Sequence, residues 1–206
     1  MSSRYFWTVV ALACLGAGFA GYRLAGARYS RPAAPAYGTW LARPRALGAF
    51  ALTDSRNRPF RNAELRGHLT LMYFGYTRCT DECPAALALL AQVQQRLARL
   101  PLQVLFVSVD PRHDTPAVLA QFVRRFDPLS LGLTGPLAQI GPLSARLGVA
   151  RGRVALPGGD TTFEHTMAIF LLDARGREVA LFTPPFDARR LAAAVQGSAE
   201  RLLTSG

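Results

Sequence analysis

Two cysteines, Cys79 and Cys83, are the residues whose type and spacing point most directly to chemistry. They follow an apolar run and open a helical pattern, so both thiols are expected in the first turn of a helix. The positive end of the helix dipole favours a thiolate over a thiol there. A spacing of four residues places both sulfurs on one face of a helix. The pair could therefore close a disulfide or hold one soft metal ion.

The residues alone leave several roles for this pair open. A disulfide between cysteines so close in sequence removes little loop entropy, which weakens a purely structural role. Cα atoms one helical turn apart are about 6 Å from each other, a distance that a disulfide tolerates, so a redox switch is possible. Two thiolates favour cuprous copper or zinc. A structural zinc site needs four protein ligands, and the chain has only three Cys and three His. Two sulfurs and one imidazole would suit copper in either oxidation state.

The candidate imidazole is His165, which comes just before a predicted buried strand. The loop that carries it would face the cysteines if that strand lay beside the strand that precedes them. His68 is expected to be exposed in a turn, and His113 to serve in capping or solvation. Asp81, between the cysteines, is expected to be either a solvated charge at the helix start or a group that tunes the thiolates or contacts a partner.

Alternating strand and helix patterns surround these residues. Thr115 and Pro116 provide a good N-cap and first residue for the helix that runs to about Phe126. Strands are predicted over 50–53, 69–76, 103–109, 130–134, 167–172 and 178–182, with a hairpin turn over 173–176. Helices are predicted over 84–100, 115–126, 137–147 and 187–203. This order indicates an α/β domain with a mixed central sheet flanked by helices, and a Cys motif at the first strand-to-helix turn is the thioredoxin-like arrangement.

The N-terminal part of the chain has a different composition. Residues 5–22 carry no charge, are just long enough to span a bilayer and have aromatic residues at both ends, which predicts a membrane anchor over 1–22. A cleaved signal peptide and an acylated Cys14 are the alternatives. Residues 23–47 are rich in Arg, Ala and Pro and predict a linker, although Tyr37, Trp40 and Leu41 are too apolar for a pure spacer and are expected to pack on the domain. The folded domain is then expected over 48–206.

Charge argues against a nucleic-acid partner. The formal net charge is +11, but residues 1–66 hold 10 arginines and two acidic residues, whereas residues 67–206 hold 14 arginines and 11 acidic residues. A nucleic-acid binder should carry its basic face on the folded domain. The arginines that follow residues 5–22 would, taken alone, place the domain in the cytoplasm.

Four motifs in order make the chain similar to a known family. They are Phe74–Pro84 (FGYTRCTDECP), Val107–Pro116 (VSVDPRHDTP), Gly132–Gly135 (GLTG) and His165–Gly176 (HTMAIFLLDARG). Together they resemble the Sco/SenC proteins, membrane-tethered copper proteins of thioredoxin-like fold that assist the assembly of cytochrome c oxidase. The resemblance runs from about Phe50 to about Leu202.

The resemblance implies a function and a site. Cys79, Cys83 and His165 fall on the three copper ligands of the family, and Asp81 on its acidic residue between the cysteines. The chain would then receive Cu(I) or Cu(II) from an upstream donor and deliver it to the CuA-bearing subunit of the oxidase. Family topology implies a single-pass protein of the cytoplasmic membrane with its domain in the periplasm. A thiol–disulfide reductase that keeps the CuA cysteines reduced, with Cys79 and Cys83 as its redox pair, is the main alternative, and a peroxiredoxin-like activity is a third.

Overall fold

A mixed sheet of eight strands forms the centre of the molecule. The computed structural model describes residues 37–149, 151–155, 161–165 and 167–204, with the backbone alone described over 151–155 and 161–165. The strands lie in the order β1-β10-β9-β4-β5-β6-β2-β3. Their bounds are β1 Thr39–Ala46, β2 Ala51–Asp54, β3 Pro59–Arg61, β4 Leu69–Gly75, β5 Leu102–Ser108, β6 Leu131–Thr134, β9 Ile169–Leu172 and β10 Arg177–Phe182.

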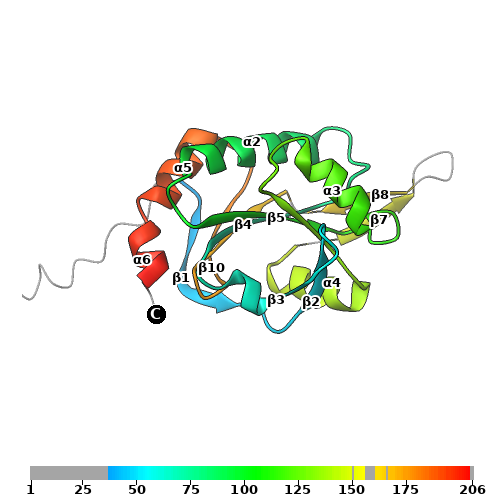
Figure 1. The fold of residues 1–206 in the computed structure, drawn as a ribbon, viewed down its shortest axis with the longest axis horizontal. Helices are drawn as coiled ribbons and strands as arrows, with labels where there is room; N and C mark the ends of the chain where they lie inside the picture. The colour runs from blue at the N-terminus through cyan, green and yellow to red at the C-terminus, as the bar shows by residue number, and fades with distance from the viewer. Residues whose placement is uncertain (1–36, 150, 156–160, 166, 205–206) are drawn as a thin grey trace, which may run out of the picture. The chain divides into compact units, whose positions relative to one another are not determined.

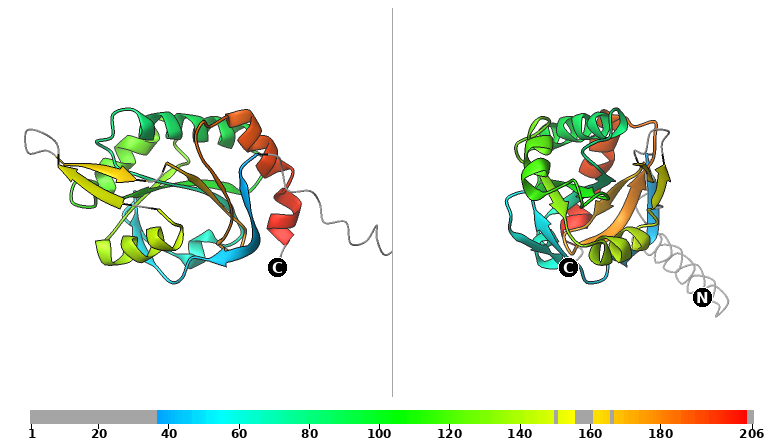
Figure 2. Two further views of the ribbon diagram at one scale, coloured as in Figure 1. Left: turned by 180° about the vertical axis from the view of Figure 1, so that it is seen from behind. Right: turned by 90° about the vertical axis from the view of Figure 1, so that its right-hand side faces the viewer.

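Helices cover both faces of this sheet. They are η1 Asn62–Leu65, α2 Glu82–Arg96, α3 Pro116–Arg124, α4 Leu137–Arg146, α5 Ala188–Gln196 and α6 Ala199–Thr204. Helices α2, α3 and α5 lie on one face and α4 lies on the other (Figures 1 and 2). A separate hairpin of β7 (Arg151–Ala155) and β8 (Thr161–His165) projects from the end of the domain opposite α6.

The middle of the sheet is the core. Every residue of β4 is buried, and β5 pairs with it in parallel over its whole length, from Leu69↔Leu102 to Gly75↔Ser108. Strand β9 runs antiparallel on the other side of β4 and is also fully buried. Continuous apolar runs are what strands covered on both faces require. The predicted strands, the hairpin turn and the Thr115 cap are therefore confirmed, the last by a hydrogen bond from the Val118 N–H to Thr115 Oγ1.

The parallel strands define two ends of the sheet. Strands β4, β5 and β6 all end on one side of the sheet, which we call the carboxyl end, and all begin on the other, the amino end. Strand β9 begins at the carboxyl end, where Ile169 pairs with Tyr73, and finishes at the amino end, where Leu172 pairs with Thr70. The residues that directly precede β9 therefore approach the carboxyl end of the sheet.

Three sequence expectations need correction. The last part of the predicted linker 23–47 is strand β1, which pairs with β10 at the edge of the sheet and is mostly exposed, so its residues carry no apolar alternation. The predicted helix 187–203 is divided into α5 and α6 at Gly197, a residue that weakens helix interiors. His165 was expected on a loop, and it is the last residue of β8.

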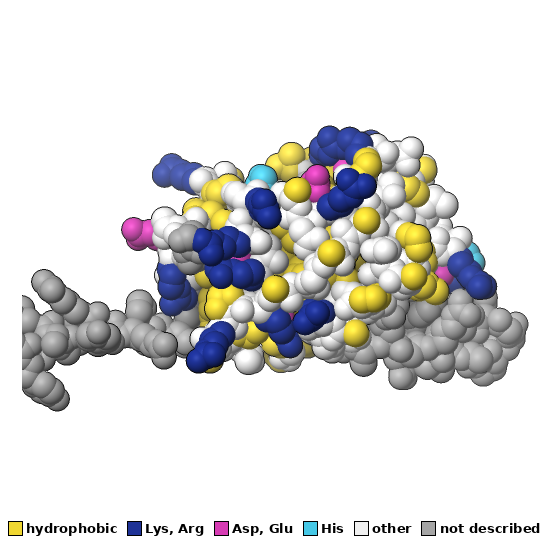
Figure 3. Space-filling model, turned by 90° about the horizontal axis from the view of Figure 1, so that it is seen from below, with side chains coloured by type: hydrophobic (Ala, Val, Ile, Leu, Met, Phe, Trp, Pro, Cys, Tyr) yellow, Lys and Arg dark blue, Asp and Glu magenta, His cyan; other side chains and the backbone are white. Residues whose placement is uncertain are grey.

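No helix among the described residues is long and apolar enough to cross a bilayer. The predicted anchor over 1–22, and Cys14 within it, lie outside those residues. Arginine side chains are spread over the face seen in Figure 3, with hydrophobic side chains between them. Several arginines of the domain pair with buried carboxylates, as Arg45 does with Glu178.

Candidate metal centre

The structure brings the two cysteines together at the carboxyl end of the sheet. Strand β4 ends at Gly75, and the chain turns through Cys79, whose N–H donates to the Tyr76 carbonyl, before α2 begins at Glu82. No disulfide joins Cys79 and Cys83. The backbone N–H of Cys83 donates to Cys79 Sγ over 3.4 Å. The Cys79 sulfur therefore lies against the first turn of α2, close to Cys83. The expectation that both thiols belong to the first turn of the helix is wrong for Cys79, which precedes the N-cap Asp81, so its position depends on the loop and not on helical spacing.

The two cysteines differ in their surroundings. Cys83 is fully buried, whereas Cys79 is 8% exposed. Cys83 Sγ packs over Gly75 so closely that a Cβ at that glycine would lie 2.7 Å from the sulfur. The Tyr73 hydroxyl is hydrogen-bonded to the Cys83 thiol, and burial raises the pKa of both groups well above their ordinary values. At Cys83, burial outweighs the effect of the helix start that was expected to favour the thiolate.

A carboxylate does contact Cys79, but it is Glu82. The Cys79 thiol donates to Glu82 Oε2 over 3.4 Å. Asp81 is exposed, and its carboxylate accepts a hydrogen bond from the Thr80 hydroxyl. Of the roles expected for Asp81, the solvated charge at the helix start fits these contacts. Sequence reasoning missed Glu82, although its position three residues after Cys79 on a helix is the signal that could have found it.

Asp110 and Asp114, in the loop that follows β5, bind the residues that precede Cys79. Asp114 accepts hydrogen bonds from the backbone N–H and the hydroxyl of Thr77. Asp110 Oδ2 lies 2.8 Å from an Arg78 guanidinium nitrogen and 2.8 Å from His113 Nδ1. The His113 ring is therefore engaged by a carboxylate within its own loop, in line with the structural role expected for it. His68 is exposed near the opposite, amino end, where its Nδ1 lies 3.0 Å from the Arg66 carbonyl oxygen.

The backbone of His165 ends β8, where it pairs with Arg151. Four residues later, Ile169 pairs with Tyr73 on β4, the strand that leads into the cysteine loop. The condition set from sequence, that the strand after His165 lies beside the strand before the cysteines, is thus met. The side chain of His165 lies outside the described residues. Among the side chains that are described, no group of three Cys, His, Asp or Glu residues could hold a metal ion.

Comparisons with known proteins point to one family. Residues 41–200 match the family model described as SCO1/SenC. A SCO2-like protein of Rickettsia prowazekii is 32% identical over 148 residues, which cover 70% of this chain and 72% of that protein. The mitochondrial SCO2 homolog of Bos taurus is 38% identical over 164 residues, which cover 75% of this chain and 58% of that protein.

Solved structures agree with the sequence comparisons. Bradyrhizobium japonicum ScoI, solved with copper bound, superposes with a TM-score of 0.67 at 33% identity and covers 79% of this chain and 99% of its own. Arabidopsis thaliana ScoI, also solved with copper bound, superposes with a TM-score of 0.71 at 25% identity and covers 75% of this chain and 98% of its own. The thioredoxin-like arrangement of a mixed sheet flanked by helices is thereby confirmed.

Proposed function

This chain belongs to the SCO1/SenC family, and we propose that it is a metallochaperone that binds copper through Cys79, Cys83 and His165. The acceptor would be the CuA centre of a cytochrome c oxidase subunit during assembly of the oxidase. An upstream donor would supply the copper as Cu(I) or Cu(II). The proposal for the anchor over residues 1–22 is a single-pass helix in the cytoplasmic membrane that leaves the domain in the periplasm.

The two neighbouring cysteines at the start of α2 carry the proposal. No disulfide joins them, and the Cys83 N–H donates to Cys79 Sγ, so the two side chains lie close enough to share one ion. Thiolates are soft ligands that select cuprous copper, and a thiolate pair with one imidazole also accepts cupric copper. Relatives at 25% and 33% identity were solved with copper bound.

The topology supports His165 as the third ligand. Because β9 begins at the carboxyl end of the sheet, beside the last residues of β4, the chain just before β9 must approach the same end as the cysteine loop. His165 lies four residues before Ile169, the first residue of β9. Imidazole is the commonest metal-binding side chain. Neither His68 nor His113 offers an equivalent position, because His68 is at the amino end and His113 is paired with Asp110.

Delivery would proceed by exchange of ligands. Cys79 is the more exposed of the two cysteines, so it is the ligand that an incoming acceptor thiolate would replace first. Cys83 is fully enclosed and would leave last. Copper would pass through coordination by ligands of both proteins, and no electron needs to move in such an exchange.

The contact of the Cys83 N–H with Cys79 Sγ, which brings the two cysteines together, also favours a thiol–disulfide reductase. Cys79, as thiolate, would attack a disulfide of the acceptor, which forms a mixed disulfide and releases one acceptor thiolate. Cys83, once deprotonated, would attack Cys79 Sγ and release the second acceptor thiolate. Two electrons pass to the acceptor disulfide, the protons of the pair pass to the acceptor thiolates, and Cys79 and Cys83 become a disulfide. A dithiol reductant would restore the pair.

Copper titration of the full-length chain, followed by absorption spectroscopy, tests the proposal. Wild type should show thiolate-to-copper charge transfer with Cu(II), and His165→Ala should lose tight binding of both copper states. His68→Ala is the matched control because it removes an exposed imidazole at the amino end of the sheet. Unchanged binding by His165→Ala would contradict the ligand set. If cells with His165→Ala assemble the oxidase in copper-poor medium, the reductase hypothesis is favoured instead.

A further inference from the structure

Thr77 lies two residues before Cys79, and both of its hydrogen-bond donors end on one distant carboxylate. The Thr77 N–H lies 3.1 Å from Asp114 Oδ2, and the Thr77 hydroxyl lies 2.6 Å from Asp114 Oδ1. Thr77 follows the last residues of β4, whereas Asp114 belongs to the loop between β5 and α3. These bonds therefore tie the cysteine loop to a part of the chain 37 residues away.

We infer that Asp114 is a positioning residue for the cysteine pair: its carboxylate fixes the loop at Thr77 and so sets where Cys79 lies relative to Cys83. The inference rests on the proposed copper site for its effect on metal binding. It does not rest on that site for its effect on the redox properties of the pair.

Asp114 lies in the interior of the protein, next to the last residue of β5, and not on the surface. It is fully buried, and the hydroxyl of Ser108, the last residue of β5, donates to Asp114 Oδ2 over 2.6 Å. The same Ser108 oxygen accepts from the Asp110 N–H over 3.0 Å. Three donors thus converge on one carboxylate, and one of those donors is itself fixed by the backbone. Such a satisfied network defines a single geometry for the groups that it joins.

The second contact to this loop is weaker as an anchor. Asp110 pairs with Arg78, but the Arg78 side chain is 42% exposed, and exposed ion pairs contribute little to a fixed geometry. The Thr77–Asp114 bonds end on a fully buried carboxylate, and the bond from the Thr77 hydroxyl is short at 2.6 Å. Asp114 is therefore the main anchor of the segment that precedes Cys79, and it acts without touching either sulfur.

The buried Asp114 carboxylate is not expected to add much to the stability of the fold. Burial raises the pKa of its carboxyl above the ordinary value, and the hydrogen bonds from Ser108 and Thr77 oppose this shift only in part. A buried carboxylate often stabilises a fold no more than a neutral side chain of the same shape would. What a neutral side chain cannot do is accept from both hydroxyl groups and the N–H. Position, rather than stability, is what this carboxylate provides.

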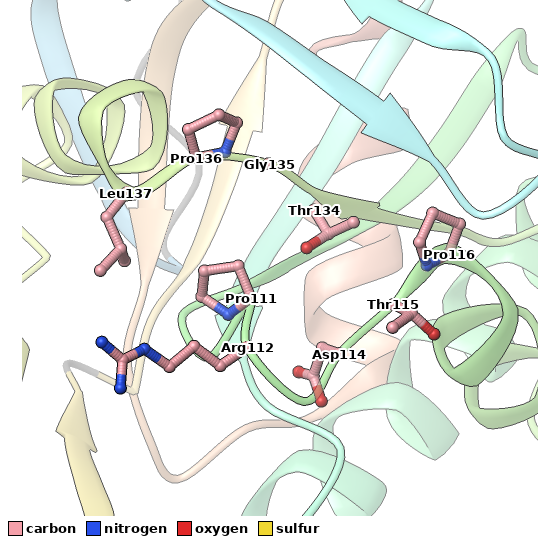
Figure 4. A pocket seen from close by; sticks show the side chains of 9 residues that line it. All are labelled: Pro111, Arg112, Asp114, Thr115, Pro116, Thr134, Gly135, Pro136 and Leu137. Atoms are coloured by element: carbon pink, nitrogen blue, oxygen red, sulfur yellow. The ribbon is translucent and has the colours of Figure 1, made fainter.

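Asp114 also lines an open pocket of about 440 Å³ between the β5–α3 loop and the start of α4. In Figure 4, Asp114 lies at the end of the pocket nearest the ribbon that leads into α2. The side chains of Arg112 and Leu137 lie at the other end. The pocket leaves room for an altered residue 114 without displacing the helices beside it. A substitution of Asp114 should therefore alter the conformation of the cysteine loop more than it alters the packing of the helices.

The test compares Asp114→Asn and Thr77→Val with Asp54→Asn in the full-length chain. In Asp114→Asn, a donating NH₂ group replaces one accepting oxygen, so one hydroxyl loses its acceptor. In Thr77→Val, the shape remains and the hydroxyl is lost. Asp54 is another buried aspartate with several donors, but it accepts from two backbone N–H groups in the turn between β2 and β3. The measurements are the thiol–disulfide equilibrium constant of Cys79 and Cys83, the copper dissociation constant and the thiolate-to-copper absorption band.

Asp114→Asn should weaken copper binding about tenfold, change the thiol–disulfide equilibrium constant by a similar factor and shift the absorption band. Thr77→Val should move all three in the same direction, Thr77→Ser should restore them, and Asp54→Asn should leave them at wild-type values. Wild-type values in both Asp114→Asn and Thr77→Val would overturn the inference. If wild type itself binds no copper, the proposed function fails, and the thiol–disulfide equilibrium still decides the role of Asp114. If Asp114→Asn does not fold, the two Thr77 variants decide it.

Discussion

The two ends of the central sheet use buried aspartates in different ways. At the amino end, Asp173 and Asp54 each close a hairpin turn with an arginine four residues later. In both turns the carboxylate accepts from the N–H groups two and four residues ahead and pairs with that arginine, Arg177 or Arg58. Both turns also place their fourth residue, Asn57 or Gly176, at a positive φ.

At the carboxyl end, Asp110 and Asp114 reach across the chain. Their partners Arg78 and Thr77 are 32 and 37 residues away in sequence. Each aspartate joins the loop after β5 to the loop after β4, and the cysteines follow directly. In open α/β sheets the functional groups gather where the parallel strands end.

The difference separates two uses of the same side chain. The aspartates of the amino end stabilise turns whose donors all lie within five residues, so they contribute to folding locally. Those of the carboxyl end fix the relation between two loops, and only there does a small displacement move a sulfur. Substitutions at the amino end should therefore change the free energy of unfolding, and substitutions at the carboxyl end should change the chemistry of the cysteines.

The largest effect on stability is expected from Asp173→Ala. Asp173 is fully buried, and its loss removes one acceptor shared by two backbone N–H groups and the Arg177 guanidinium. Breaking such a pair should cost about 3 kcal/mol in the free energy of unfolding. Urea unfolding of the full-length chain measures this loss. The thiol–disulfide equilibrium of Cys79 and Cys83 should stay at its wild-type value, and a change in it would contradict the separation of the two ends.

Local features of this fold could be predicted from the sequence. The apolar runs of β4 and β5, the Thr115–Pro116 helix start and the turn at Asp173 each depend on neighbours within a few residues. The short spacing of Cys79 and Cys83 likewise predicted that the two side chains lie close together, although Cys79 precedes α2 and shares no helix face with Cys83. Such features can be predicted from sequence because the residues that determine each of them lie within one short segment.

Features that depend on distant partners could not be predicted in this way. Strand β1 forms because β10 offers it an open edge, and its own residues show no strand pattern. The bond from Thr77 to Asp114 requires β4 and β5 to end together, which follows from their parallel register and not from either motif. Burial of Cys83 beneath Tyr73 and Gly75 has the same origin. The position of His165 was inferred from topology and stays a prediction.

A second prediction examines the packing of Cys83. In Gly75→Ala, the new Cβ would lie 2.7 Å from Cys83 Sγ and 2.7 Å from Phe106 Cε2, so the sulfur must move. We expect a stability loss of about 2 kcal/mol from overpacking together with weaker copper binding. In Gly132→Ala on β6, the Cβ would meet Leu119 Cβ, also at 2.7 Å, and no sulfur.

Gly132→Ala is thus a control with the same nearest approach of 2.7 Å. It should lose stability by a similar amount and bind copper as wild type does. Copper titration with absorption spectroscopy, alongside urea unfolding, distinguishes the two variants. Equal copper affinities in both would show that displacement of Cys83 Sγ does not matter to the site.

The smallest expected effect distinguishes the two turns of the amino end from each other. Asn57 has φ +59 and Gly176 has φ +74, a conformation that costs about 1 kcal/mol for alanine. Asn57→Ala should therefore lower the free energy of unfolding by about that amount. Gly176→Ala should lower it further, because its Cβ would also lie 2.9 Å from Leu65 Cβ, next to the core. Paired urea unfolding curves give the difference between the variants. Equal losses would mean that Leu65 moves aside freely, so that the turn at Asp173 is no more tightly packed than the turn at Asp54.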